Sequence, residues 1–216
     1  KGNFTTALYN FKKALTNKSL ELNIYNKLGF IYLEQYVNYD SSIYYYKKEL
    51  EIHRKNKEGL TYLNNNKIYY DNILSNLYNI LGKAYLRSND YKNAIIFQEK
   101  SLNICDTSNK AIYSNILTEL GHLHSVNLNF KLALKYIEKS LSIRKSMDTS
   151  KTHTKALIAW NNSDIGYNYL RSLKTKKALE YFDNAILEWD KIIQKDSNSI
   201  DEVNVEKAKV YTYIGK

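Results

Sequence analysis

Apolar residues recur along this chain with the spacing of buried helix faces. Apolar positions fall at i, i+3, i+4 and i+7, which predicts helices that each bury one face. Five such stretches end in an aliphatic residue followed by glycine: Leu28-Gly29, Leu81-Gly82, Leu120-Gly121, Ile165-Gly166 and Ile214-Gly215. Three residues after the glycine, the first, second and fourth copies carry Tyr32, Tyr85 and Tyr169, and the third carries His124. The chain is therefore expected to be built from repeated helices.

A second signature follows each of the first four glycines. It consists of a polar turn and then a small residue that opens a new apolar stripe: Ser42, Ala94, Ala133 and Ala178, with Ala7 in an opening copy that lacks its first half. The small residue lies 13 residues after the glycine once (29 to 42) and 12 residues after it three times (82 to 94, 121 to 133 and 166 to 178). This constancy within variable surroundings indicates one rigid helical hairpin.

The combined pattern resembles the tetratricopeptide repeat (TPR), whose helix A carries a bulky residue, Leu-Gly or Leu-Ala, and then tyrosine. Helix B of that family carries alanine, an aromatic residue and alanine, and the matching triplets are Ala7/Phe11/Ala14 and Ala178/Phe182/Ala185. The resemblance implies an all-α fold, a right-handed α-solenoid (superhelix) of antiparallel helix pairs. It also implies that the glycine and the small residue lie where helices A and B cross.

The repeats are longer than the usual TPR period of about 34 residues. Successive glycines are separated by 53 (29 to 82), 39 (82 to 121), 45 (121 to 166) and 49 (166 to 215) residues, and proline is absent. Long repeats of this kind resemble the arrays of kinesin light chains, of Leu-Gly-Asn-repeat adaptors and of bacterial signalling proteins. The largest insertion, residues 58–70, is expected to be an exposed elbow or an added helical turn.

The pattern predicts one TPR array over residues 1–216, which we expect to be a fragment of a longer chain because it opens in mid-motif. Its expected parts are helix B of a truncated repeat at 1–18, full repeats at 20–57, 67–106, 108–147 and 152–196, and helix A of a truncated repeat at 201–216. The predicted helices span 4–17, 20–34, 38–56, 67–87, 90–105, 109–125, 129–146, 153–172 and 174–195, and a last one begins near 201. Uncapped end repeats could support self-association.

Composition agrees with a packed, helical protein. Hydrophobic residues make up 44% of the chain and charged residues 25%, and only 7 glycines and no proline are present to interrupt helices. The formal net charge of +10 favours acidic partners, although spread lysines are also typical of a solvated surface. Nucleic acid is a less favoured partner, because the chain is poor in arginine and carries no known nucleic-acid-binding motif.

The resemblance implies that helix A lines a concave groove and that its positions 2, 5, 9 and 12 face the ligand. With the glycine counted as position 8, position 2 holds Asn23, Asn76, Asn115 and Trp160, position 5 holds Asn26, Asn79, Thr118 and Ser163, and position 9 holds Phe30, Lys83, His122 and Tyr167. A row of amides can bind the backbone of an extended peptide, because each carries donors and an acceptor. The aromatic residues would then be apolar anchors and Lys83 a charge contact. The alternative is that these are ordinary exposed polar residues of an asparagine-rich chain.

No motif of a catalytic, cofactor or metal site is found. There is no Gly-rich phosphate loop, no G-x-S-x-G and no H-E-x-x-H. His122 and His124 are two residues apart and would face different sides of a helix, whereas metal ligands on a helix are usually four apart. We therefore expect neither an enzyme nor a bound cofactor or metal. His53 and His153 are expected to be solvated, and Trp189 to lie in the core.

The expected location is cytoplasmic. Cys105 is the only cysteine, so no intrachain disulfide can form, and no apolar run approaches the roughly 20 residues that span a bilayer. No signal peptide is visible either.

Three functional hypotheses follow from the sequence. The first is a non-enzymatic scaffold or adaptor that binds a protein or an extended peptide in the groove, with an acidic partner favoured by the net charge. The second is a regulatory or ligand-sensing domain of a larger signalling enzyme or transcription regulator. The third and least favoured is nucleic-acid binding through the basic surface.

Overall fold

The computed structural model describes residues 4–15, 21–59, 64–195 and 200–215, and these ranges form helices joined by turns, with no strand among them. The helices are α1 (Phe4–Ala14), α2 (Glu21–Glu34), α3 (Tyr39–Gly59), α4 (Asn64–Arg87), α5 (Tyr91–Ile104), α6 (Lys110–Val126), α7 (Phe130–Lys145), α8 (Thr152–Arg171), α9 (Thr175–Lys195) and α10 (Ile200–Ile214). The chain divides into two compact units, Lys1–Asp106 and Thr107–Lys216, each with its own packed helices.

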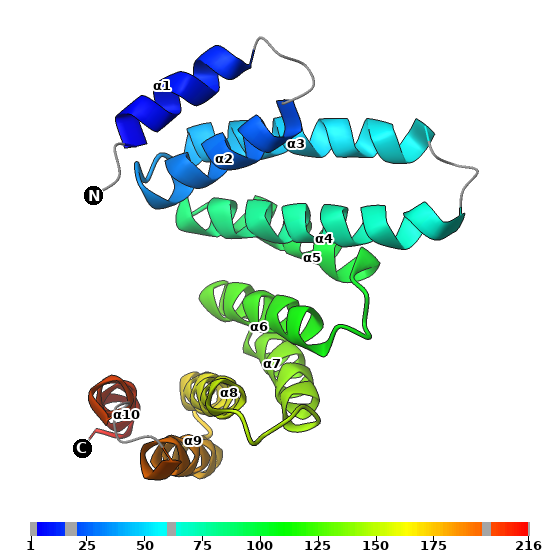
Figure 1. The fold of residues 1–216 in the computed structure, drawn as a ribbon. Helices are drawn as coiled ribbons and strands as arrows, with labels where there is room; N and C mark the ends of the chain where they lie inside the picture. The colour runs from blue at the N-terminus through cyan, green and yellow to red at the C-terminus, as the bar shows by residue number, and fades with distance from the viewer. Residues whose placement is uncertain (1–3, 16–20, 60–63, 196–199, 216) are drawn as a thin grey trace. The chain divides into compact units, whose positions relative to one another are not determined.

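Each unit is built from helical hairpins (Figure 1). The pairs α2–α3 and α4–α5 form the first unit with α1, and the pairs α6–α7 and α8–α9 form the second with α10. The predicted helices agree with the observed ones to within one turn. No described helix is long and apolar enough to cross a membrane.

The extra residues of the first long repeat lengthen its helices. Helix α3 has 21 residues and α4 has 24, whereas α2 and α5 have 14 each. The predicted insertion at 58–70 thus contributes the end of α3 and the first turns of α4, as the added-turn alternative expected. Residues 60–63 lie outside the described residues.

The turns between helices A and B share two backbone features in the four described hairpins. One residue adopts a left-handed conformation with φ between 51° and 62°: Val37, Asn89, Leu128 and Leu173. The next residue donates its backbone N–H to a carbonyl at the end of helix A, as in the 2.9 Å bond from Asp90 to Tyr85. Equivalent bonds of 2.8 and 2.9 Å join Asn129 to His124 and Lys174 to Tyr169. This bond closes the helix and fixes the 12-residue spacing.

The first hairpin contains one more residue in this turn. Its bond runs from Asn38 to Tyr32, one residue further than in the other hairpins. This extra residue accounts for the spacing of 13 between Gly29 and Ser42.

A side-chain cap begins helix B in other hairpins. The side chain of Asp90 accepts the backbone N–H of Asn93, and the side chain of Asn129 accepts that of Leu132.

The glycines lie where helices A and B approach most closely, as predicted. A Cβ atom placed on any of the four would come within 3.0 Å of a helix B side chain, and the side chains in question are Tyr46, Gln98, Ile137 and Phe182. The small residues are buried beside these crossings, at Ser42, Ala94, Ala133 and Ala178. Only glycine allows the two helices to lie so close.

An aromatic stack repeats in each hairpin and explains the tyrosine that follows the glycine. Its ring stacks on a helix B ring with centroids 5.3 to 5.6 Å apart, in the pairs Tyr32–Tyr45, Tyr85–Phe97, His124–Tyr136 and Tyr169–Tyr181. His124 occupies the tyrosine position of the third copy because an imidazole can make the same contact.

Neighbouring helices of the second unit share its core. Ile137 and Leu141 of α7 pack with Ile158 and Ile165 of α8, which joins one hairpin to the next. Helix α10 buries Val203 against Trp189 and Val210 against Phe182. Trp189 is 3% exposed, so its expected core position is confirmed.

Replacement of Gly166 by alanine is expected to destabilise the chain by roughly 1–2 kcal/mol, although alanine favours helix. The new Cβ would lie 2.7 Å from Cδ1 of Phe182 and 3.1 Å from the carbonyl oxygen of Ala178, and neither the buried ring nor the backbone can move away freely. Urea unfolding followed by circular dichroism measures the loss. Gly82→Ala is the control, since it meets the more flexible side chain of Gln98 and should cost less. A Gly166→Ala protein as stable as the native chain would contradict this account.

Candidate functional site

The predicted groove residues of the first unit fall into two groups. Asn23 and Asn76 are exposed, and Phe30 is 50% exposed. Asn26 instead donates its amide to the carboxylate of Glu49 on α3, with both distances 3.2 Å. Asn79 accepts a 3.0 Å bond from Gln98 on α5 through its side-chain oxygen. Asn26 and Asn79 therefore hold helix A against helix B. Lys83 is half-buried on α4, the helix that also carries Asn79.

The predicted residues of the second unit are more strongly engaged inside the protein. Thr118 is buried and bonds to Ser140 and Asn161 at 2.8 and 3.2 Å. His122 lies 2.7 Å from Asp164 of α8. Ser163 bonds to a backbone carbonyl of its own helix, and the ring of Tyr167 contacts that of Tyr213 at 5.2 Å.

Arg144 is the centre of a buried polar network that the sequence reasoning did not identify. Its guanidinium donates to the side-chain oxygens of Asn115 (2.8 Å) and Asn161 and to the carbonyl of Leu157 (3.1 Å). The side chain is 3% exposed, and burial lowers its pKa to about 10, against the opposing effect of the Asp164 carboxylate. It therefore ties α7 to both α6 and α8. The signal available in the sequence was an arginine three residues after Leu141, on the buried stripe of its helix.

His122 and Asp164 form an ion pair between the A helices α6 and α8. Burial lowers the pKa of His122, but the hydrogen bond to Asp164 and its charge outweigh burial, so the net shift of this pKa is upward. Two adjacent hairpins are thus joined across the face that the sequence assigned to the ligand.

Glu49 is a buried carboxyl group in the first unit. Burial raises its pKa to about 7, although the hydrogen bond from Asn26 acts in the other direction. His53 lies one turn further along α3, with its Nε2 3.9 Å from Glu49. The side chain of His53 is only 14% exposed, and burial lowers its pKa. The prediction that His53 is solvated was therefore wrong, whereas His153 is exposed, as predicted.

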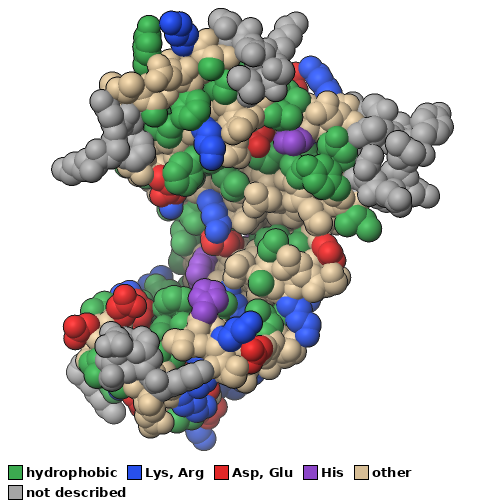
Figure 2. All heavy atoms as spheres, in the orientation of Figure 1, with side chains coloured by type: hydrophobic (Ala, Val, Ile, Leu, Met, Phe, Trp, Pro, Cys, Tyr) green, Lys and Arg blue, Asp and Glu red, His purple; other side chains and the backbone are tan. Residues whose placement is uncertain are grey.

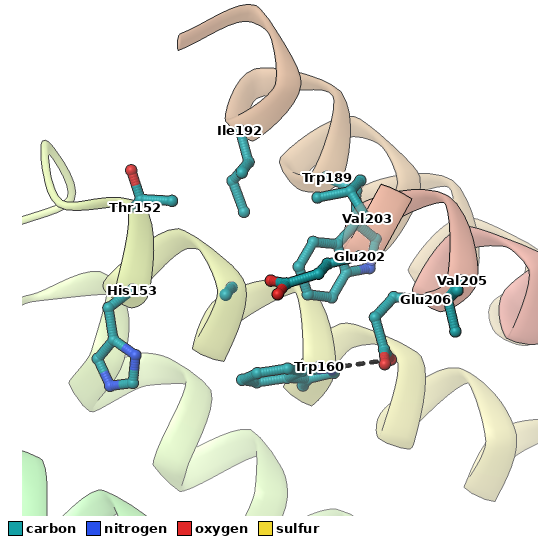
Figure 3. Close-up of a pocket in the computed structure, with 10 residues that line it drawn as sticks. Thr152, His153, Trp160, Trp189, Ile192, Glu202, Val203, Val205 and Glu206 are labelled. Atoms are coloured by element: carbon teal, nitrogen blue, oxygen red, sulfur yellow. Dashed lines mark hydrogen bonds between the residues drawn. The ribbon is translucent and has the colours of Figure 1, made fainter. Parts of the chain in front are cut away.

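A cavity of about 390 Å³ adjoins Trp160 in the second unit (Figure 3). It lies between the start of α8, the end of α9 and the start of α10. Its lining consists of Thr152, His153, Ala156, Trp160, Trp189, Ile192, Glu202, Val203, Val205 and Glu206. The indole N–H of Trp160 donates to Glu206 at 3.0 Å, which fixes the ring, and the two tryptophan rings meet edge to face at 5.5 Å. The N–H of Trp189 is buried and has no acceptor among the described residues.

The described residues contain no group of three or more His, Cys, Asp or Glu side chains that could hold a metal ion. Cys105 is half-buried at the end of α5, and burial raises the pKa of its thiol. The raised pKa makes the thiolate less available at neutral pH.

Comparison with known proteins rests on structure alone, since no protein-family model and no curated sequence matches this chain. The structure resembles that of RapI, with a TM-score of 0.72, 17% identity and coverage of 98% of this chain and 73% of RapI. MamA matches with a TM-score of 0.65 and 20% identity, over 89% of this chain and 92% of MamA. A putative kinesin light chain from Podosopora anserina with nearly identical TPR-like repeats matches with a TM-score of 0.66 and 14% identity, over 90% and 86%. This chain has the TPR fold.

Within this TPR fold the helix A positions have two different roles. Asn23, Phe30, Asn76 and Trp160 present exposed side chains to solvent. Other members of the predicted set are bonded to helix B or to the next helix A: Asn26, Asn79, Asn115, Thr118 and His122. The asparagines of positions 2 and 5 are therefore not one uniform row.

Arg144→Met is expected to lower the free energy of unfolding by about 2 kcal/mol or more, because the buried oxygen of Asn161 would lose its charged donor. Chemical unfolding of the native and substituted chains gives the difference. Lys145→Met is the control, as it removes the same charge from the exposed next residue of α7 and should change stability by about 0.5 kcal/mol at most. Equal effects of the two substitutions would contradict the role of the network.

Glu49 should make the first unit less stable as pH rises. Its pKa is about 7 when folded and near 4.5 when unfolded, so between these values the folded chain holds a proton that the unfolded chain releases. The contribution of this proton is therefore complete below about pH 4.5 and lost as pH rises through 7, a change on the order of 3 kcal/mol.

Unfolding of native and Glu49→Gln chains at pH 5 and pH 8 tests this directly. The substitution should flatten the fall in stability, whereas Glu51→Gln, at an exposed position two residues further along α3, should leave it unchanged. His53 remains in all three proteins, and its lowered pKa acts in the opposite sense. A fall of the same size in Glu49→Gln would show that other groups cause it.

Proposed function

We propose that this TPR chain is a non-enzymatic module that binds a partner protein or an extended peptide through its A helices. The observation that carries the proposal is an exposed aromatic side chain on an A helix of each unit, Phe30 at 50% and Trp160 at 40%. Helices of a packed repeat bury most of their aromatic rings, and exposed aromatic residues are the commonest anchors of protein interfaces. The TPR fold supports the same function by analogy.

The structure favours a smaller contact set than the full ladder of helix A positions. In the first unit, Asn23 and Asn76 can offer amide groups to a peptide backbone, and Phe30 and Lys83 also lie on its A helices. Trp160 and Tyr167 are the corresponding residues of the second unit. The remaining positions, Asn26, Asn79, Asn115, Thr118, His122 and Ser163, would support this surface through their internal bonds. Specific recognition would then depend on the aromatic side chains.

The basic charge does not single out a nucleic acid. On the face seen in Figure 2, Lys and Arg side chains are scattered among hydrophobic and acidic ones. A protein or peptide with acidic segments is a better match for dispersed charges of this kind.

A second candidate is a ligand-sensing domain of a larger protein. It is favoured by the cavity beside Trp160, whose volume of about 390 Å³ falls within the range of roughly 300–1,000 Å³ of small-molecule pockets. In that case a bound small molecule, rather than a peptide, would occupy the cavity.

Quantitative affinity capture with a matched pair of double variants tests the proposed function. Phe30→Ala with Asn76→Ala removes two exposed helix A side chains, and we expect a partner captured by the native chain to be reduced about tenfold or more. Tyr44→Ala with Asn103→Ala is the control, because it removes an aromatic residue and an asparagine of similar exposure from helices α3 and α5 of the same hairpins.

Circular dichroism first establishes that both variants keep the native helicity. Loss of the partner in the helix A variant alone supports the proposal. Equal capture by both variants, or loss in the control variant alone, would place binding on another surface and overturn it.

A further inference from the structure

The cavity beside Trp160 combines two indole rings with acidic groups. Trp160 and Trp189 form one wall, Ile192, Val203 and Val205 add apolar surface, and α10 contributes Glu202 and Glu206. Among the lining residues that the structure describes there is no lysine or arginine, and His153 is the one basic side chain. In a chain of net charge +10, this is a local region of the opposite sign.

We infer that this cavity binds the cationic side chain of a lysine or arginine in a partner peptide. The inference rests on the proposed peptide-binding function and specifies the chemistry that one of its contacts would recognise.

The carboxylates are arranged so that one of them remains available. Glu206 accepts the indole N–H of Trp160 through one oxygen and lies 2.6 Å from Nζ of Lys209 through the other. Glu202 is exposed in the first turn of α10 and has no hydrogen bond or ion pair within the described part of the chain. A cation that entered the cavity could therefore pair with Glu202 without breaking an existing bond.

The aromatic wall provides the second element of recognition. The hydrogen bond to Glu206 fixes the orientation of Trp160, and in Figure 3 its ring is seen edge-on beneath the carboxylate of Glu202. An ammonium or guanidinium group is attracted to the face of an indole, while its aliphatic stem can pack on apolar surface such as Ile192 and Val203. An acidic side chain would meet repulsion from the same carboxylates.

Intrinsic fluorescence provides a local probe, because the only two tryptophans of the chain both line this cavity. The chain is titrated with three capped tripeptides that differ in their central residue: arginine, citrulline as the neutral analogue of the same shape, and glutamate. Only the arginine peptide should change the emission in a saturable way, and its affinity should fall as salt is added.

Two single variants identify the contacts, with one matched control. Glu202→Gln should weaken binding of the arginine peptide by about threefold or more, and Trp160→Leu, followed through Trp189, by about fivefold or more. Asp201→Asn should leave the affinity unchanged, because it removes a charge from the same first turn of α10 but does not line the cavity.

Equal binding of the citrulline or glutamate peptide, or an equal effect of Asp201→Asn, would overturn the inference. Binding of free arginine amide as tightly as the peptide would show that a small organic cation, and not a peptide side chain, is the ligand. If none of the probes binds while affinity capture still depends on Phe30 and Asn76, this inference fails and the proposed function stands. If the arginine peptide binds but helix A substitutions do not affect capture, the cavity is a cation site and the proposed function fails.

Discussion

The close crossing of helices A and B at a glycine is the constraint on which each hairpin depends. At Gly166 a single added carbon would already lie 2.7 Å from the ring of Phe182. Two helices held so near must also be joined by a turn of fixed geometry, and the left-handed residue with its bond back to the tyrosine position provides it. The stack of rings between the helices accompanies this turn in every hairpin, and the first hairpin keeps it although its turn is one residue longer. Glycine, turn and tyrosine therefore recur together because each requires the others.

The helix B positions that depart from the TPR pattern are matched by changes on helix A. Where the family carries a second alanine, three copies carry a polar residue, and each has a partner: Glu49 with Asn26, Ser101 with Ser75, and Ser140 with Thr118. Two copies keep alanine, at Ala14 and Ala185, and Ala185 is buried without such a pair. A buried polar group is costly unless it is bonded, so a change on one helix constrains the residue opposite. Several asparagines of helix A are explained by this constraint without any ligand.

The sequence was sufficient for the fold because the repeat is a local pattern. Glycine spacing, apolar period and small residues depend on contacts within one hairpin, so they predicted the helices to within a turn. The site was less predictable, because a column of helix A residues does not reveal what lies opposite on helix B. Asn23 and Asn26 look alike in sequence, yet only Asn26 faces the carboxylate of Glu49. Arg144 was missed for the same reason, since its partners come from two other helices.

The cavity beside Trp160 lies where the sequence departs from the pattern of the earlier repeats. In α2, α4 and α6 position 2 is asparagine, a small polar residue, whereas α8 places an indole there. The ring is too large to be covered by its own hairpin and remains 40% exposed, held by Glu206 of the next helix. Helix α10 brings Glu202 to the same wall through its acidic first turn, a position that the helix dipole favours for carboxylates in any case. Helix stability alone can thus explain why acids are found there, but it does not explain why they lie over an exposed indole, beside a cavity with no lysine or arginine among its described lining residues. That combination requires α8 to provide an indole and α10 to provide carboxylates around the same cavity. It distinguishes the α8–α9 hairpin from the repeats before it.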